Sequence, residues 1–276
     1  MRKINYRLIV SDFDGTLVRE DGSISDKNKK AIAEYTQNGG MFAVSTGRLH
    51  YGILPRVKEL GLNGVVCCCQ GAVIIDILSG DPILSGTLSH ETTIQACVEM
   101  EKLGLHIHVY CFDGYYSNMD DDALKMYERA VRVKAKTVID MPISQFVKEN
   151  KICAYKVLAM VAVEDSAKVI AALSKTAFDG ACVTKSADFL VEIVNAEYSK
   201  GTAVRFLAER YGVPIEKVIG VGDQNNDIPM IEAAGLGIAV KNADEELKRA
   251  ANRVYGYTNE EDAVGRIVEE YGYTEE

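Results

Sequence analysis

The feature that most constrains the fold of this chain is a regular alternation of short apolar runs with helical patterns near its start. Each apolar run is four or five residues long, as in a strand that is buried on both faces. The first intervening helical pattern ends at Gly39-Gly40 and the second at Gly61. The runs are Arg7–Val10, Met41–Val44 and Val65–Cys69. Strand, helix, strand, helix, strand predicts a parallel sheet with helices on both faces.

The same alternation returns toward the end of the chain, so both ends are expected to contribute to one sheet. We expect helices over Lys200–Tyr211, Ile228–Ala234, Asp244–Ala251 and Glu260–Tyr271, and strands over Val218–Val221 and Leu236–Val240. The predicted fold class is α/β, with a doubly wound, mostly parallel, Rossmann-like sheet.

A stretch with a different pattern separates these two parts. Asp113-Gly114 is a strong signal for a tight hairpin. The other patterns indicate the helices His90–Leu103 and Glu164–Thr176, a further helix between them, and the strands Tyr155–Val163, Ala181–Thr184 and Phe189–Val194. Together they predict an inserted α/β domain made of an open sheet with helices on one face. We expect residues 1–83 and 189–276 to form the core domain and residues 84–188 to form the insertion.

Composition and charge exclude several classes of function. The chain is 47% hydrophobic and 26% charged, as in an ordinary globular protein, and its apolar runs are too short for a signal peptide or a membrane span. A soluble, cytoplasmic protein is therefore expected. The net charge of −9 argues against binding to nucleic acid, which needs a cationic surface. Any site for an anion must be built locally.

The seven cysteines are most simply read as small buried hydrophobes in a reducing compartment. Cys67, Cys68 and Cys69 are consecutive. Because neighbouring strand residues point to opposite faces, these three thiols are not expected to hold one metal ion.

Two carboxylates follow the first predicted strand directly, in the motif Asp12-Phe-Asp14-Gly-Thr-Leu. The strand period of two places Asp12 and Asp14 on the same side, at the carboxyl end of the strand. Open α/β sheets bind their ligands at this edge. Gly15 would let the chain turn away beside a bound group.

Three further motifs stand at a strand end or a helix start of the same predicted sheet. Gly222-Asp223-Gln-Asn-Asn226-Asp227 adds two carboxylates and an amide. Ser45-Thr46-Gly47-Arg48 offers a hydroxyl and backbone N–H groups near a helix N-terminus, which is a natural anion site. Lys200 opens the helix that follows the insertion. Each motif alone fits a turn, a cap or a solvated helix residue, but four of them in a fixed order point to one site.

In order and spelling, these motifs resemble the haloacid dehalogenase superfamily of phosphohydrolases, and specifically its Cof-like (type IIB) branch, over essentially the whole chain. In that branch an α/β cap domain is inserted between the second and third motifs. The resemblance implies a Mg²⁺-dependent phosphatase that hydrolyses a small phosphorylated metabolite, such as a sugar phosphate or a phosphorylated cofactor, through an aspartyl-phosphate.

The resemblance also implies a role for each motif residue. Asp12 would be the nucleophile and Asp14 the general acid/base. The phosphate would be held by Thr46, Gly47, Lys200, Asn226 and the backbone at Phe13. Mg²⁺ would be bound by Asp12, the backbone carbonyl of Asp14 and Asp223, with Asp227 in support.

Two departures from the branch are visible. Gln70-Gly71-Ala72 stands where Asn-Gly-Ala is usual, and Ala263 stands where a glycine is common. Neither position lies in a motif that performs chemistry, so the departures concern loop geometry and substrate preference.

Electrostatics explains why acidic motifs and a lysine must converge. Bringing a carboxylate to about 3.5 Å from a phosphate dianion costs about 9 kcal/mol at an effective dielectric constant of about 20. A divalent cation and one ammonium group are the minimum that reverses this repulsion. Carboxylate and carbonyl oxygens are the ligands that suit Mg²⁺.

The insertion is expected to set substrate specificity. Alternation along the strand around residues 106–112 puts Ile107, Val109 and Cys111 on one face, where we expect cap helices to pack. His106, His108 and Tyr110, with Phe112, would face the other way, either over the active site or on an ordinary exposed or inter-strand face. A metal site at the two histidines is disfavoured because no third ligand stands near them in the sequence.

Two alternatives remain open. A phosphomutase would use the same aspartyl-phosphate, and a non-catalytic ligand-binding protein could share the fold, although such a protein should have lost Asp12, Asp14, Lys200 or Asp223. A P-loop nucleotide hydrolase is disfavoured because the chain lacks the Gly-x4-Gly-Lys-Ser/Thr motif. The natural substrate and the oligomeric state stay open.

Overall fold

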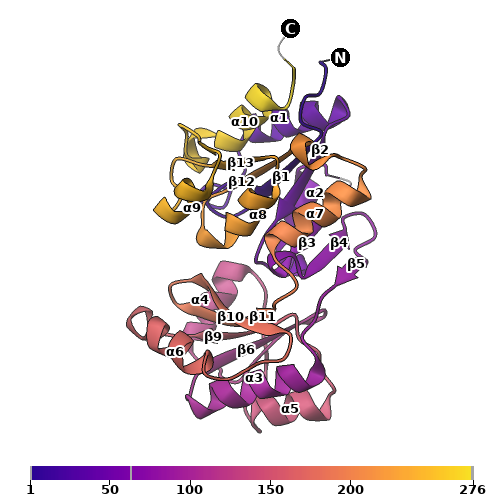
Figure 1. Ribbon diagram of the computed structural model, residues 1–276. Helices are drawn as coiled ribbons and strands as arrows, with labels where there is room; N and C mark the ends of the chain where they lie inside the picture. Colours follow the sequence, from indigo (N-terminus) through magenta and orange to yellow (C-terminus); the bar gives the residue numbers. More distant parts are fainter. Residues whose placement is uncertain (1, 63, 275–276) are drawn as a thin grey trace. The chain divides into compact units, whose positions relative to one another are not determined.

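The computed structural model describes residues 2–62 and 64–274, which form two compact units (Figure 1). The first unit is made of the chain up to Gly47, of Ile53–Ile83 and of the chain from Ser199 onward. The second unit is made of Arg48–Gly52 and Leu84–Tyr198. Each unit has its own sheet.

Within the described residues, the first unit contains an eight-stranded sheet. Its strands in spatial order are β14 (Arg253–Val254), β13 (Leu236–Ala239), β12 (Val218–Gly222), β1 (Leu8–Asp12), β2 (Met41–Ser45), β3 (Val65–Cys68), β4 (Val73–Asp76) and β5 (Pro82–Ser85, in the first unit up to Ile83). The pairings from β14 to β3 are parallel, which confirms the predicted fold class. β4 runs antiparallel to β3. The sequence patterns had not indicated β4 or β5.

Helices cover both faces of this sheet, as its central strands require because they are buried on both sides. The helices are α1 (Asp26–Gln37), α2 (His50–Glu59, in the first unit from Ile53 onward), α7 (Lys200–Arg210), α8 (Ile228–Ala233), α9 (Glu245–Ala250) and α10 (Ala263–Tyr271). α1 packs against α10 and α7 packs against α8 (Figure 1). The contact between α1 and α10 is close at Gly265, whose backbone N–H donates a hydrogen bond to Asn28 Oδ1 (2.8 Å).

The second unit contains a six-stranded sheet of mostly antiparallel pairs. Its strands in spatial order are β10 (Ala181–Ala187), β11 (Leu190–Asn195), β9 (Lys156–Met160), β6 (His106–Cys111), β7 (Gly114–Ser117) and β8 (Lys136–Thr137). Because β11 pairs with β10 and β9, it belongs to this sheet. The second unit therefore runs on to Tyr198, whereas the boundary expected at residue 188 would divide the β10–β11 hairpin.

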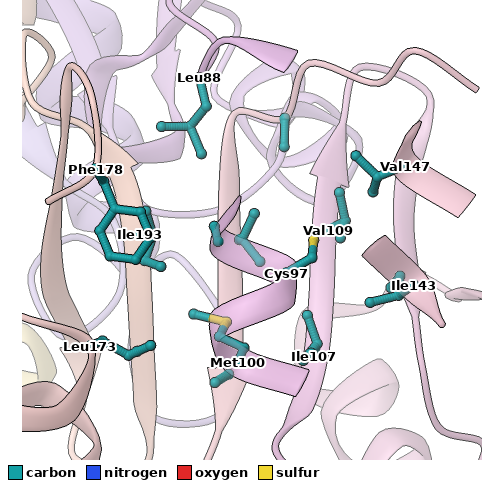
Figure 2. Packing of buried hydrophobic residues seen from close by; sticks show 14 of the residues in the cluster. Leu88, Cys97, Met100, Ile107, Val109, Ile143, Val147, Leu173, Phe178 and Ile193 are labelled. Carbon is teal, nitrogen blue, oxygen red and sulfur yellow. The ribbon is translucent and has the colours of Figure 1, made fainter. Parts of the chain in front are cut away.

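The helices of the second unit are α3 (His90–Lys102), α4 (Asp122–Val131), α5 (Ile143–Glu149) and α6 (Ser166–Leu173). Ile107 and Val109 of β6 pack against Cys97 of α3 and Val147 of α5 in one buried cluster (Figure 2). This packing confirms the prediction that the apolar face of this strand lies under helices.

The prediction that helices lie on one face only is wrong for α4. Tyr127 of α4 forms a hydrogen bond with Tyr110 through their hydroxyl groups, and its ring centroid lies 4.9 Å from that of His108. Tyr110 and His108 are on the face of β6 opposite Ile107 and Val109, so α4 covers the second face. The predicted hairpin forms between β6 and β7, but its turn is shifted by one residue from the expected Asp113-Gly114: Phe112 and Asp113 are the two loop residues and Gly114 is the first residue of β7.

All seven cysteines are free. Cys67, Cys68 and Cys69 are buried in the first unit, and Cys97 and Cys111 are buried in the second. Burial raises the pKa of the Cys67 thiol to about 12, so this thiol stays protonated and packs as a small apolar group. Among the described helices, none is both long and apolar enough to cross a bilayer.

Candidate active site

The registers of three neighbouring strands bring the sequence motifs to one edge of the first sheet. Asp12, the last residue of β1, lies opposite Ser45, the last residue of β2. On the other side of β1, Ser11 lies opposite Val221 of β12. Thr46 and Asp223 therefore follow their strands at the same carboxyl edge, where parallel α/β sheets bind ligands.

Lys200 joins this edge from the first turn of α7. Its side chain is buried, and Nζ donates hydrogen bonds to Asp12 Oδ1 and Asp227 Oδ1, each at 2.5 Å. The helix starts here because the Ser199 side chain accepts from the Thr202 N–H and the Thr202 hydroxyl oxygen accepts from the Ser199 N–H. The capping box thus fixes the residue that carries the ammonium group into the site.

Asp227 has protein partners on both of its carboxylate oxygens. Oδ1 accepts from Lys200, while Oδ2 accepts from the backbone N–H groups of Asp223 (3.0 Å) and Gln224 (3.1 Å). A Cβ atom on Gly222 would lie 2.5 Å from Asp227 Cβ, so glycine is needed for this turn to close. Asp227 therefore ties the turn after β12 to Lys200.

Asp223 also contacts two residues of the Asp12-Phe-Asp14-Gly-Thr-Leu motif, Thr16 and Gly15. The Thr16 hydroxyl donates to Asp223 Oδ1 at 2.6 Å. Gly15 has a φ of +77°, and a Cβ there would lie 2.4 Å from Asp223 Oδ2, so both the backbone and the space require glycine. Thr16 was assigned no role from the sequence, although its place two residues after Asp14 in the same motif was an available signal.

The carboxylates and the lysine shift each other's pKa values. Burial raises the pKa of Asp12 well above its usual range, the Lys200 ammonium opposes this, and Asp227 and Asp223 add to it. Burial raises the pKa of Asp223 to about 6 against the opposing hydrogen bond from Thr16. Burial alone would lower the pKa of Lys200, but the charges of Asp12 and Asp227 outweigh it and raise that pKa. Lys200 is therefore a permanent cation.

The acidic side chains suit a hard divalent cation. Asp12, Asp223 and Asp227 each offer a carboxylate oxygen, and these atoms lie within 4.8 Å of one another. Three buried carboxylates face one ammonium group, which leaves negative charge for a further cation to balance. A set made of oxygens alone favours Mg²⁺ over softer metals.

Asp14 lies apart from this buried group. β1 ends at Asp12, so the period of two does not extend to Asp14, which is exposed in the following turn and forms an isolated β-bridge with Val18. Phe13 between them is buried, and its carbonyl accepts from the N–H groups of Leu17 and Val18. This turn leaves Asp12 as the buried acid and Asp14 as the solvent-facing one.

The remaining core residues named from the sequence lie on the loops after β2 and β12. Thr46 is buried, and its backbone N–H donates to the Cys67 carbonyl at 2.9 Å. Asn226 Nδ2 donates to Gln70 Oε1 at 3.2 Å. A Cβ on Gly47 would lie 2.7 Å from Gln70 Nε2. Gln70 thus contacts both loops, which the sequence did not indicate.

The three residues named for specificity lie in the second unit and are buried there. His106 Nε2 lies 3.0 Å from Ser117 Oγ and 3.2 Å from His108 Nε2. Burial lowers the pKa of His108 to about 3, so this imidazole is neutral. His106 also lines a cavity of about 570 Å³ between the ends of β6, β9 and α6. The role of His106, His108 and Tyr110 in substrate choice stays a prediction.

Comparison with known proteins adds independent evidence. The family sequence model of the haloacid dehalogenase-like hydrolases matches residues 9–268 of this chain. A Haemophilus influenzae protein with a provisional phosphatase name is 32% identical over 265 residues, which is 96% of this chain and 98% of that protein. A Bacillus subtilis 5-amino-6-(5-phospho-D-ribitylamino)uracil phosphatase is 26% identical over 268 residues, which is 96% of this chain and 97% of that protein. The solved structure of a haloacid dehalogenase-like hydrolase from Bacteroides thetaiotaomicron has a TM-score of 0.84 at 27% identity, with 96% of this chain and 99% of that chain covered.

Proposed function

Because the chain belongs to the haloacid dehalogenase-like hydrolases, in their Cof-like branch, and is a phosphoric monoester hydrolase, we propose that it cleaves small phosphorylated metabolites through a phosphorylated Asp12 with Mg²⁺ as cofactor. One observation carries this proposal: Lys200 Nζ bonds both Asp12 and Asp227 beside Asp223 at the carboxyl edge of the sheet. A buried acid that is oriented by a permanent cation fits a nucleophile better than it fits a structural ion pair.

In the first step, an Asp12 carboxylate oxygen attacks the phosphorus in line, and the bond from phosphorus to the alcohol oxygen breaks. Asp14 in its protonated form gives its proton to the departing oxygen. The exposure of Asp14 supports this role, because a general acid must reach both the leaving group and water.

In the second step, a water molecule attacks the phosphorus of the aspartyl-phosphate and gives a proton to Asp14. The bond from Asp12 to phosphorus breaks, inorganic phosphate leaves and the Asp12 carboxylate is restored. Asp14 is then protonated again for the next substrate.

Lys200, Thr46, Gly47, Asn226 and the backbone at Phe13 would hold the phosphate oxygens. Asp12, Asp223 and the Asp14 carbonyl would hold Mg²⁺, and Asp227 would support both groups through Lys200 and the turn after β12. When bound, Mg²⁺ supplies positive charge that offsets the repulsion between the carboxylates and a phosphate dianion.

The substrate class is a small phosphorylated metabolite, since the named relative acts on a phosphorylated ribitylamino-uracil. A phosphomutase shares the first step and is the second candidate, but it would pass the phosphoryl group to a sugar hydroxyl instead of water. Release of inorganic phosphate from a panel of metabolites, with Mg²⁺ present and then chelated, separates the two.

The intermediate itself can be trapped. Acid quenching followed by borohydride reduction converts an aspartyl-phosphate to homoserine, which peptide mass spectrometry can place. We expect homoserine at residue 12 after incubation with a turned-over substrate. Substrate-dependent reduction at another acid, or none during rapid turnover, would contradict Asp12 as the nucleophile.

A further inference from the structure

We infer that Gln70 is a positioning residue of the active site, which clamps the loop after β2 to the loop after β12 and orients Asn226 toward the phosphate. This inference rests on the proposed function, in which both loops bind phosphate. Gln70 lies in neither loop. It follows β3 in a short 3₁₀ turn (Cys69–Gly71).

The backbone at this turn is held in an unfavourable conformation. Cys69 has a φ of 48° and Gln70 a φ of 59°, both in the left-handed region that residues with a Cβ rarely adopt. Each such residue costs about 1 kcal/mol or more. The surrounding contacts must offset this cost, and Gln70 N–H donates to the Thr46 carbonyl at 3.0 Å. The strained turn is thus attached directly to the loop after β2.

The side chain of Gln70 then spans the two loops. Its Nε2 lies so close over Gly47 that a Cβ there would approach it to 2.7 Å. Its Oε1 accepts from Asn226 Nδ2 at 3.2 Å. The nitrogen of the Gln70 carboxamide therefore lies next to Gly47, and its oxygen accepts a hydrogen bond from Asn226.

Asn226 depends on this contact for its orientation. Its Oδ1 is buried and has no hydrogen-bond partner among the described residues, so the bond from Nδ2 to Gln70 is what fixes the carboxamide. An amide nitrogen carries two hydrogens. Gln70 takes one of them, which leaves the second for a phosphate oxygen.

The experiment measures the affinity of the full-length protein for inorganic phosphate by titration calorimetry in Mg²⁺, together with steady-state hydrolysis. Gln70→Asn keeps the carboxamide but shortens the side chain by one methylene, and Asn tolerates the left-handed region better than Gln. We expect its thermal midpoint to be retained and its phosphate affinity to fall about 3- to 10-fold, as for one lost hydrogen bond. KM should rise by a similar factor. Gln37→Met, at an exposed position of α1, is the control and should change neither value.

A double-mutant cycle with Asn226→Ala separates positioning from a general structural effect. A second variant, Gln70→Met, replaces the carboxamide by an apolar side chain of similar length. If Gln70 acts through Asn226, Gln70→Asn and Gln70→Met should each weaken phosphate binding in the wild-type background but change it less than about 2-fold in the Asn226→Ala background. Equal losses in both backgrounds, or wild-type affinity in both Gln70 variants, would overturn the inference. Calorimetry measures phosphate binding independently of turnover. A wild-type protein that binds phosphate but hydrolyses no ester would contradict the proposed function, while the role of Gln70 in phosphate binding could still be tested.

Discussion

Asp12, Asp223 and Asp227 place three carboxylates around the single ammonium group of Lys200 in a buried site. Removing one partner from such a buried pair costs about 3–5 kcal/mol because the remaining charge is left uncompensated. With three carboxylates against one ammonium group, the site is rich in acidic oxygens, which suits the binding of a metal cation.

Asp12→Asn is expected to abolish turnover. The amide keeps the shape of the side chain but has no anionic oxygen with which to attack phosphorus, so we expect kcat to fall roughly 10⁴-fold or more. Initial rates of phosphate release at saturating substrate measure the change. Asp81→Asn, at an exposed position directly before β5, is the matched control and should keep wild-type rates. An Asp12→Asn protein with even a tenth of wild-type kcat would rule out covalent catalysis by this residue.

Asp223 sets a pH dependence of stability in the metal-free protein. Its pKa of about 6 lies above the ordinary value of 3.8, so the folded state holds the neutral acid better than the unfolded state does. Its contribution is fully present below pH 3.8 and is lost as the pH rises through about 6. In chelator, Asp223→Asn should therefore be more stable than wild type above this window, by roughly 1–3 kcal/mol.

Denaturant unfolding of both proteins at pH 4 and pH 7 tests this expectation. The gap in the free energy of unfolding should close toward pH 4. Saturating Mg²⁺ should reverse its sign at pH 7, because the metal needs the ionised carboxylate. A gap that does not change with pH would contradict the assignment.

Among the elements, α7 has the strictest demands because its first residue is Lys200. The capping box at Ser199 fixes where the helix begins, and a shift by one residue would turn the ammonium group away from Asp12 and Asp227. A Cβ on Gly201 would lie 2.3 Å from the Pro229 carbonyl oxygen, so this glycine lets α7 approach the start of α8. This contact between α7 and α8 therefore holds Lys200 close to the turn that ends in Asp227.

Gly265→Ala is expected to destabilise the α1–α10 pair. A Cβ there would lie 2.7 Å from Asn28 Oδ1 and 3.2 Å from Asn28 Cα. Asn28 cannot move aside easily because its side chain also donates to the Leu17 carbonyl at 3.2 Å. We expect a loss of about 1–3 kcal/mol in the free energy of unfolding, despite the better helix propensity of alanine. Gly256→Ala, where a Cβ meets no atom within 4 Å, should change it by less than about 0.5 kcal/mol.

The elements show how far sequence reasoning reaches. Strands and helices of the doubly wound sheet were predictable because buried parallel strands are continuous apolar runs, and because the helices after β1 and β2 are followed by glycines, at Gly39 and Gly61. The expected domain boundary at residue 188 wrongly separated β11 from the sheet of the second unit. A boundary between domains has no sequence periodicity that would mark its position. The position of α4 was missed because Tyr127 meets Tyr110 through hydroxyl groups, which an apolar pattern does not mark.

In the site, the motif spelling indicated Asp12, Asp14, Asp223 and Lys200. The registers of β1 and β12 explain why Asp12 and Asp223 meet, whereas Lys200 reaches them from the start of α7. Thr16 and Gln70 could not be assigned in this way. Their contacts depend on side chains that come from distant segments, and neither residue type is diagnostic by itself.

For the molecule as a whole, the net charge of −9 opposes the approach of a phosphorylated substrate. Under the proposed function, the attraction comes at short range from Lys200 and from Mg²⁺. We expect hydrolysis to fall to background in EDTA and to return when Mg²⁺ is restored in excess. Far-UV circular dichroism in EDTA serves as the control that the fold persists, and turnover that persists after exhaustive chelation would contradict a metal requirement.

The seven free thiols differ in burial, so their reactivity toward an alkylating reagent can report on unfolding. Cys153 and Cys182 are exposed, so an alkylating reagent should modify them in the native state. Cys67, Cys68 and Cys69 should react only when the first unit opens, and Cys97 and Cys111 only when the second does. Pulse alkylation along a denaturant series, read peptide by peptide, would therefore give a separate melting curve for each half without any introduced label.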